Sequence, residues 1–115
     1  MDFHYLRHLA HLGTTHLHPH TRMATDILIQ QLALQPGQSV LELGCGTGAT
    51  LVQIAQEHEG ALFGVDILPE MLAVARKRVR LAGLARRITL QQITAGEPLP
   101  FAAATFHRVY VESVL

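Results

Sequence analysis

A short apolar run followed at once by an alternating glycine cluster constrains the fold of this chain more than any other feature. The run is Val40-Leu41-Glu42-Leu43, and the cluster is Gly44-Cys45-Gly46-Thr47-Gly48. Because only Glu42 interrupts the run, it predicts a strand that is buried on both faces. Residues 47–58 carry apolar residues at helical spacing. A strand, a glycine turn and a helix in this order are typical of α/β proteins.

The alternation of strands and helices continues along the chain. Residues 61–65 form a second apolar run that ends in Asp66, and residues 69–82 repeat apolar side chains at spacings of three and four. Two more strands are predicted over residues 88–93 and 106–112, which are rich in β-branched and aromatic side chains. Strands that alternate with helices predict an α/β fold with a doubly wound, mainly parallel sheet.

Two helical segments precede these elements. Apolar residues recur at helical spacing over residues 2–12 and again from Thr21, and the second segment ends at a Gln-Pro-Gly turn over residues 35–37. We therefore divide the chain into an N-terminal helical cap, residues 1–36, and an α/β domain, residues 37–115.

Composition limits the classes of protein to which the chain can belong. Its 115 residues suit one small domain, and 49% hydrophobic against 16% charged residues excludes disorder. Nine basic and nine acidic residues cancel, so no net charge favours nucleic acid or an anionic membrane as a partner. The apolar runs are far shorter than the roughly 20 residues of a membrane span. A soluble, cytoplasmic protein is expected.

The basic and metal-binding residue types form two further clusters. Six of the nine basic residues lie between Arg76 and Arg87, where they predict a solvated helix face. Six of the eight histidines lie between His4 and His20, in a segment without cysteine, and no metal site is predicted there. The single cysteine, Cys45, excludes an internal disulfide and a multi-cysteine zinc site.

The glycine cluster and Asp66 together indicate a nucleotide-like ligand. Gly44, Gly46 and Gly48 let the backbone turn sharply and approach a ligand at a helix N-terminus. Asp66 ends the next predicted strand, from which a carboxylate can accept hydrogen bonds from ribose hydroxyls. Two alternatives stay open at this point: a tight turn with Asp66 as a helix cap, and a nicotinamide cofactor, because Ala49 completes the dinucleotide fingerprint.

The motifs resemble those of a known family. The stretch from Val40 to Gly48 closely resembles the first motif of class I S-adenosylmethionine-dependent methyltransferases, in which an acid precedes an alternating glycine triplet. Residues 64–72, Gly-Val-Asp-Ile-Leu-Pro-Glu-Met-Leu, resemble that family's second-strand motif, and residues 99–106 and 111–115 are similar to its fourth-strand region. The likeness covers about residues 37–115 and implies a Rossmann-like fold.

The resemblance also implies roles for individual residues. The glycines would line the methionine and ribose parts of S-adenosyl-L-methionine, and Glu42 would lie near the methionine amino group. Asp66 would bind the ribose hydroxyls, while Ile67 would pack on the adenine. The cofactor-binding residues expected in this way are Glu42, Gly44, Cys45, Gly46, Thr47, Gly48, Asp66, Ile67, Ala95 and Gly96.

Two positions depart from the family pattern. Ala95 stands where the family usually has an acid that accepts from the adenine amino group, so either adenine recognition is weakened or Glu97 substitutes. His107 stands where the family usually has Asp, and we interpret it as a solvent-facing histidine. Cys45 matches the family, where this position is commonly a packing cysteine and not a nucleophile. Residues 17–25 resemble an N-terminal segment that covers the cofactor, with His18 and Thr21 as loose candidates for contact.

The implied activity is methyl transfer to a small-molecule acceptor, with no general base that the sequence identifies. The family's later strands, which follow the fourth, are missing from this chain. We therefore expect an unpaired edge at the fourth strand, with Val109, Val111 and Leu115 lacking cover. Two interpretations stay open: the chain is part of a longer enzyme, or it is a half-domain that self-associates through this edge. A non-catalytic interaction module that uses this edge is the alternative function.

Overall fold

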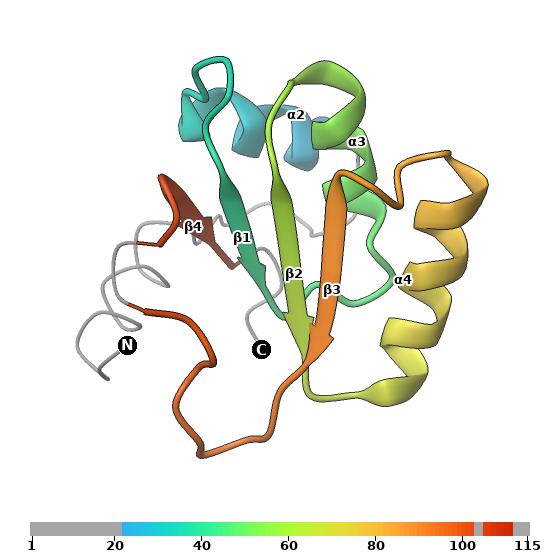
Figure 1. Cartoon of the computed structure of the whole chain (residues 1–115). Helices are drawn as coiled ribbons and strands as arrows, with labels where there is room; N and C mark the ends of the chain where they lie inside the picture. The colour runs from blue at the N-terminus through green and yellow to red at the C-terminus, as the bar shows by residue number, and fades with distance from the viewer. Residues whose placement is uncertain (1–21, 103–104, 112–115) are drawn as a thin grey trace.

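The chain folds into a parallel sheet with a layer of helices against it (Figure 1), in a computed structural model that describes residues 22–102 and 105–111. The described elements, in order, are α2 (Arg22–Leu32), β1 (Val40–Leu43), α3 (Ala49–Glu57), β2 (Leu62–Asp66), α4 (Pro69–Leu81), β3 (Ile88–Gln92) and β4 (Arg108–Tyr110). The predicted alternation is confirmed. The helix predicted over residues 2–12 lies outside the described residues.

The order of the strands places a topological switch beside the glycine loop. The sheet order is β3-β2-β1-β4, and every neighbouring pair is parallel. Glu42 of β1 is in register with Gly64 on one side and Tyr110 on the other. From β1 the chain therefore adds β2 and then β3 on one side, and it then crosses over to place β4 on the other side of β1. Open parallel sheets bind ligands beyond the carboxyl ends of their strands at such a point.

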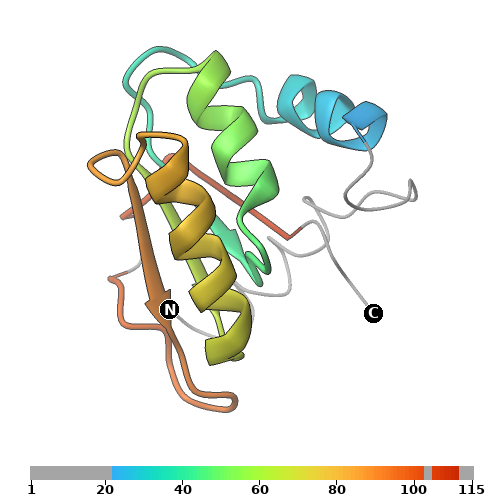
Figure 2. The same cartoon turned by 90° about the vertical axis from the view of Figure 1, so that its right-hand side faces the viewer.

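The main apolar core lies between the sheet and the helices, where α3 and α4 run side by side over one sheet face (Figure 2). Each helix contributes its buried stripe, as the helical spacing of its apolar residues requires. The buried members of this core are Leu28, Leu32, Val40, Cys45, Leu51, Ile54, Ala55, Leu62, Leu72, Val79, Ile88 and Tyr110. No helix among the described residues has the length and apolar character needed to cross a membrane.

The second face of the sheet is covered by the segment that follows β3. Phe101 and Phe106 pack edge-on against each other and against Phe63 of β2, and the ring centroids of Phe63 and Phe106 are 5.0 Å apart. Val109 is only 7% exposed in this cluster. The expectation that Val109 would lack cover is therefore wrong, because Phe106 occupies the sheet face beside it. Val111 is half-buried, and Leu115 lies outside the described residues.

Arg87, a member of the basic cluster, binds the end of α3. The Arg87 guanidinium donates to the carbonyl oxygens of Ala55 at 2.6 Å and Gly60 at 3.2 Å, and also to that of His58. These carbonyls lie at the C-terminal end of α3, where a positive charge is favoured by the helix dipole. The prediction of a solvated face for the whole basic cluster is therefore wrong for Arg87.

Candidate functional site

The glycine loop between β1 and α3 adopts a backbone that only glycine takes readily. Gly44, Gly46 and Gly48 have φ values of +73°, +53° and +78°. A Cβ built on Gly44 or Gly46 would meet no atom within 4 Å, whereas one on Gly48 would lie 3.1 Å from the Cβ of Ala75. Gly48 therefore allows the start of α3 to pack on α4, and the other two glycines border open space.

The loop is tied to the end of β2 by backbone and carboxylate hydrogen bonds. The amides of Gly44 and Cys45 both donate to the carbonyl of Val65 at 2.9 Å. The Gly46 amide donates to Oδ2 of Asp66 at 2.8 Å, and the Leu68 amide donates to Oδ1 at 3.0 Å. An ionised carboxylate has about four acceptor sites, so each oxygen of Asp66 can accept a further hydrogen bond.

Two acidic side chains and one thiol of the site are buried. Glu42 is 2% exposed and Asp66 is 7% exposed, and Cys45, in the loop after β1, is 3% exposed. Burial raises the pKa of the Cys45 thiol to about 12, and the negative charges of Glu42 and Asp66 add to the increase. Cys45 therefore stays protonated at neutral pH, which agrees with its expected role in packing and not as a nucleophile.

Two supports of the loop were not identified from the sequence. A Cβ on Gly64 would lie 2.6 Å from Cδ1 of Leu51 and 2.9 Å from Cβ of Cys45, so only glycine lets both side chains pack on β2. A lone glycine inside a predicted strand was the available signal. From α4, Nε of Arg78 donates to the carbonyl of Thr47 at 3.1 Å.

The remaining predicted residues, Ile67, Ala95 and Gly96, lie at the same edge of the sheet but make fewer hydrogen bonds with the glycine loop. Ile67 follows Asp66 and is 48% exposed. The Ile93 amide donates to the Asp66 carbonyl at 3.0 Å, so the segment after β3 starts beside the site. Ala95 and Gly96 are exposed on that segment, and among the described residues no hydrogen bond joins them to the glycine loop.

A small hollow of about 200 Å³ lies next to this segment. Its lining residues are Gln91, Gln92, Ile93, Thr94, Glu97, Pro98 and Pro100. Glu97, the proposed substitute for the acid missing at Ala95, is thus one of the polar groups of the hollow. The sequence did not identify Gln92 or Thr94 as members of this group.

The histidines do not contribute to the site in the described part of the chain. His107 is exposed and its Nδ1 lies 3.0 Å from the amide of Ser39, which donates to it. This contact joins the amino ends of β1 and β4, at the edge opposite the glycine loop. His18 and Thr21 lie outside the described residues, and within residues 22–102 and 105–111 no three His, Cys, Asp or Glu side chains gather as metal ligands.

The sequence of the chain is similar to those of known methyltransferases. A family model described as a methyltransferase domain matches residues 40–115. An O-methyltransferase of Pyrenophora dematioidea is 34% identical over 95 residues, which cover 82% of this chain and 35% of that protein. A demethylmenaquinone methyltransferase of Symbiobacterium thermophilum is 41% identical over 83 residues, which cover 70% of this chain and 33% of the relative.

A solved structure shows the same arrangement of elements. The crystal structure of a SAM-dependent methyltransferase from Geobacter sulfurreducens, in complex with S-adenosyl-L-homocysteine, superposes with a TM-score of 0.59 and 32% identity. The match covers 69% of this chain and 32% of that structure. The chain therefore spans about a third of each of these proteins.

Proposed function

Because the chain belongs to the methyltransferase-domain family, we propose that it forms the cofactor-binding half of an S-adenosyl-L-methionine-dependent methyltransferase. The observation that carries the proposal is the hydrogen bond from the Gly46 amide to Asp66, which joins the glycine loop and the acid in one site. In this proposal residues 37–115 form the cofactor-binding domain, and residues 1–36, which include α2, form the N-terminal cap.

The residues present fit this cofactor in shape. The open side of Gly44 and Gly46 is space that a side chain would fill, so the methionine and ribose parts can approach the backbone there. Cys45, Thr47 and Gly48 complete the loop that surrounds this space. The free acceptor sites of Asp66 suit two ribose hydroxyls, while its other acceptor sites keep the loop in place.

The residues also fit the cofactor in charge. S-adenosyl-L-methionine carries a positive sulfonium and a positive amino group, and the site has two buried carboxylates, Glu42 and Asp66. We assign Glu42 to the side of the methionine amino group. A negative site favours the charged sulfonium over neutral or anionic competitors.

The adenine would lie beyond Asp66, between Ile67 and the segment after β3. Ile67 offers an exposed apolar side chain for the ring face. Ala95 and Gly96 would line the ring edge, and Glu97 supplies the nearby carboxylate that Ala95 lacks. A carboxylate at this position would accept a hydrogen bond from the adenine amino group.

The bound cofactor would supply an activated methyl group, so the protein's main task is to position it in line with the acceptor. We propose a small-molecule acceptor, because the similar proteins include an O-methyltransferase and a demethylmenaquinone methyltransferase. No side chain of the described residues is assigned as a general base. The cytoplasmic location stays a prediction from composition.

Calorimetry tests the proposal directly. The 115-residue chain is titrated with S-adenosyl-L-methionine and S-adenosyl-L-homocysteine, and NADH serves as the comparison ligand. We expect both adenosyl compounds to bind and NADH not to bind. A folded chain that binds neither adenosyl compound would contradict the proposal, and preferential binding of NADH would favour the nicotinamide alternative.

The Asp66→Ala variant locates the site. Loss of charge-assisted hydrogen bonds is expected to weaken binding by about 1.5–3 kcal/mol. Asp26→Ala is the matched control, because Asp26 is an exposed carboxylate on α2 that contacts Gln53. Urea denaturation of both variants separates lost binding from lost folding. Equal affinity of wild type and Asp66→Ala would remove Asp66 from the site.

The alternative function, a non-catalytic module, would use the outer edge of β4. Within the described residues β4 pairs with β1 alone, which leaves its other edge without a strand there. Light scattering over a range of micromolar concentrations tests self-association through this edge. A monomer at every concentration would argue against the self-associating module, and methyl transfer by the chain would exclude a non-catalytic role.

A further inference from the structure

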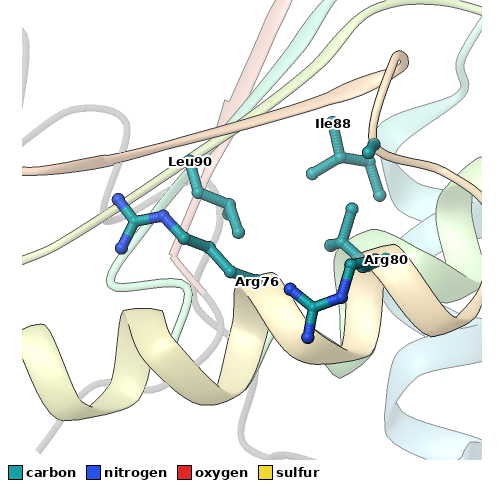
Figure 3. A pocket seen from close by; sticks show the side chains of 6 residues that line it. Arg76, Arg80, Ile88 and Leu90 are labelled. Carbon is teal, nitrogen blue, oxygen red and sulfur yellow. The ribbon is translucent and has the colours of Figure 1, made fainter.

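A second pocket lies between α4 and the outer strand β3, separate from the glycine loop. Its volume is about 270 Å³, and its lining residues are Arg76, Val79, Arg80, Ala85, Ile88 and Leu90. Arg76 and Arg80 reach it from α4, and Ile88 and Leu90 come from β3 on the opposite side (Figure 3). None of the six is among the proposed cofactor-binding residues.

The two arginines bring positive charge to this pocket. They are four residues apart on α4, which places them on the same face of the helix. Within the described residues neither guanidinium makes a hydrogen bond or an ion pair, whereas those of Arg78, Arg87 and Arg108 all donate to backbone carbonyls. Like charges at this spacing repel each other, and an anion between them would relieve the repulsion.

The rest of the pocket is apolar. Val79 and Ile88 are buried beneath it, Leu90 is half-buried at its side, and Ala85 lies in the turn before β3. A bare inorganic anion would leave this apolar surface in contact with water. An occupant that satisfies both parts of the pocket therefore has a charged head and a short apolar body.

We infer that this pocket binds a small organic anion, a carboxylate or a phosphate monoester with a short hydrocarbon chain. The anionic group would lie between Arg76 and Arg80, because guanidinium groups bind carboxylate and phosphate oxygens in a bidentate manner. The hydrocarbon chain would pack on Val79, Ile88 and Leu90. The simpler interpretation is that the arginine stems merely cover apolar surface, in which case no selective binding occurs.

The test is a titration of the full chain with hexyl phosphate and, separately, with hexanoate. Binding is followed by calorimetry and by NMR of the Ile88 and Leu90 methyl groups. Two comparison probes are used: inorganic phosphate, which lacks the hydrocarbon chain, and hexanol, which lacks the charge. We expect at least one amphipathic anion to bind about ten-fold more tightly than both comparison probes, with shifts at Ile88 and Leu90 but not at Ile67.

Three single variants on α4 locate the binding. Arg80→Gln is expected to weaken binding about ten-fold, and Arg80→Lys is expected to weaken it less because the charge is kept. Lys77→Gln is the matched control, because it also removes one charge from α4 but lies outside this pocket. Circular dichroism confirms that each variant is folded, which is expected since both side chains are exposed.

Several results would overturn the inference. Absence of binding by both hexyl phosphate and hexanoate would do so, as would inorganic phosphate binding as tightly as hexyl phosphate. Equal weakening by Lys77→Gln and Arg80→Gln would show a diffuse charge effect in place of a site. The relative affinities of hexyl phosphate and hexanoate indicate which head group the pocket prefers.

Discussion

Alanine variants of Gly44 and Gly83 separate the effect of backbone strain on stability from the effect of a blocked ligand contact on affinity. Both have φ of +73°, and a Cβ on either would meet no atom within 4 Å. An alanine at each position carries the same conformational cost of about 1–2 kcal/mol for a left-handed backbone. Gly83 follows α4 at the far edge of the sheet, while Gly44 borders the proposed cofactor space. The two alanine variants are therefore expected to lose similar stability.

Their affinities for S-adenosyl-L-homocysteine should differ. In Gly44→Ala the new methyl group occupies space that the protein leaves open and that we assign to the cofactor. By analogy with overpacked cores, the steric cost is about 1–3 kcal/mol, or roughly a 5- to 150-fold weaker binding. Gly83→Ala has no such contact and is expected to bind like the wild type.

The assay combines urea denaturation with calorimetry at 25 °C. The first measures the free energy of unfolding of each variant without ligand, and the second measures affinity for folded protein. Wild-type affinity in Gly44→Ala would show that the space beside Gly44 is not used by the cofactor. An equal loss of affinity in Gly83→Ala would show that the effect comes from lost stability and not from contact at the loop.

Three further predictions concern folding. The pKa of Cys45 rises from 9.0 to about 12 in the folded state, so its contribution to stability is complete below pH 9 and falls by about 1.4 kcal/mol per pH unit between 9 and 12. Urea denaturation from pH 8 to 11 should show a flatter pH dependence for Cys45→Ala than for wild type, and parallel curves would contradict this. Arg87→Gln should lose about 1.5–3 kcal/mol of unfolding free energy, because the contacts of Arg87 with the carbonyls at the end of α3 are lost. Arg86 is exposed, so the control variant Arg86→Gln should change the unfolding free energy by less than about 0.5 kcal/mol. Similar losses in the two variants would refute the capping role of Arg87. Phe106→Ala should cost about 3–5 kcal/mol in the same assay, and a loss below about 1 kcal/mol would mean that Phe106 does not cover the sheet.

The sequence predicted best those elements whose limits are set by local chemistry. The bounds of β1 were predicted from its apolar run and the glycine that follows it, and they are confirmed as Val40–Leu43. The helix predicted over residues 47–58 begins two residues later, at Ala49, because Gly48 has a left-handed backbone and acts as the N-cap. The strand predicted over residues 106–112 begins two residues later, at Arg108, and Phe106 packs in the apolar cluster of the second sheet face.

The features that the sequence did not reveal depend on contacts between distant residues. Arg87 looks like any other member of its basic cluster, and only the end of α3 beside it makes it a cap. Gly64 looks like a weak strand residue until Leu51 and Cys45 are placed against it. Phe101 and Phe106 have no periodic spacing, so their segment did not predict a cover for the second face of the sheet.

The site itself was predictable because neighbouring parallel strands end at the same edge of the sheet. Residues that follow two such strands in the sequence therefore lie close together. The glycine loop follows β1 and Asp66 ends β2, and in a parallel pair these carboxyl ends meet at one edge. The hydrogen bond between Gly46 and Asp66 joins these two strand ends. Ala95 and Gly96 lie several residues beyond the end of β3, where no register determines their distance from the loop. For this reason the loop and Asp66 form the better-determined part of the site, and variants at Gly44 and Asp66 test the proposed function more directly than variants at Ala95.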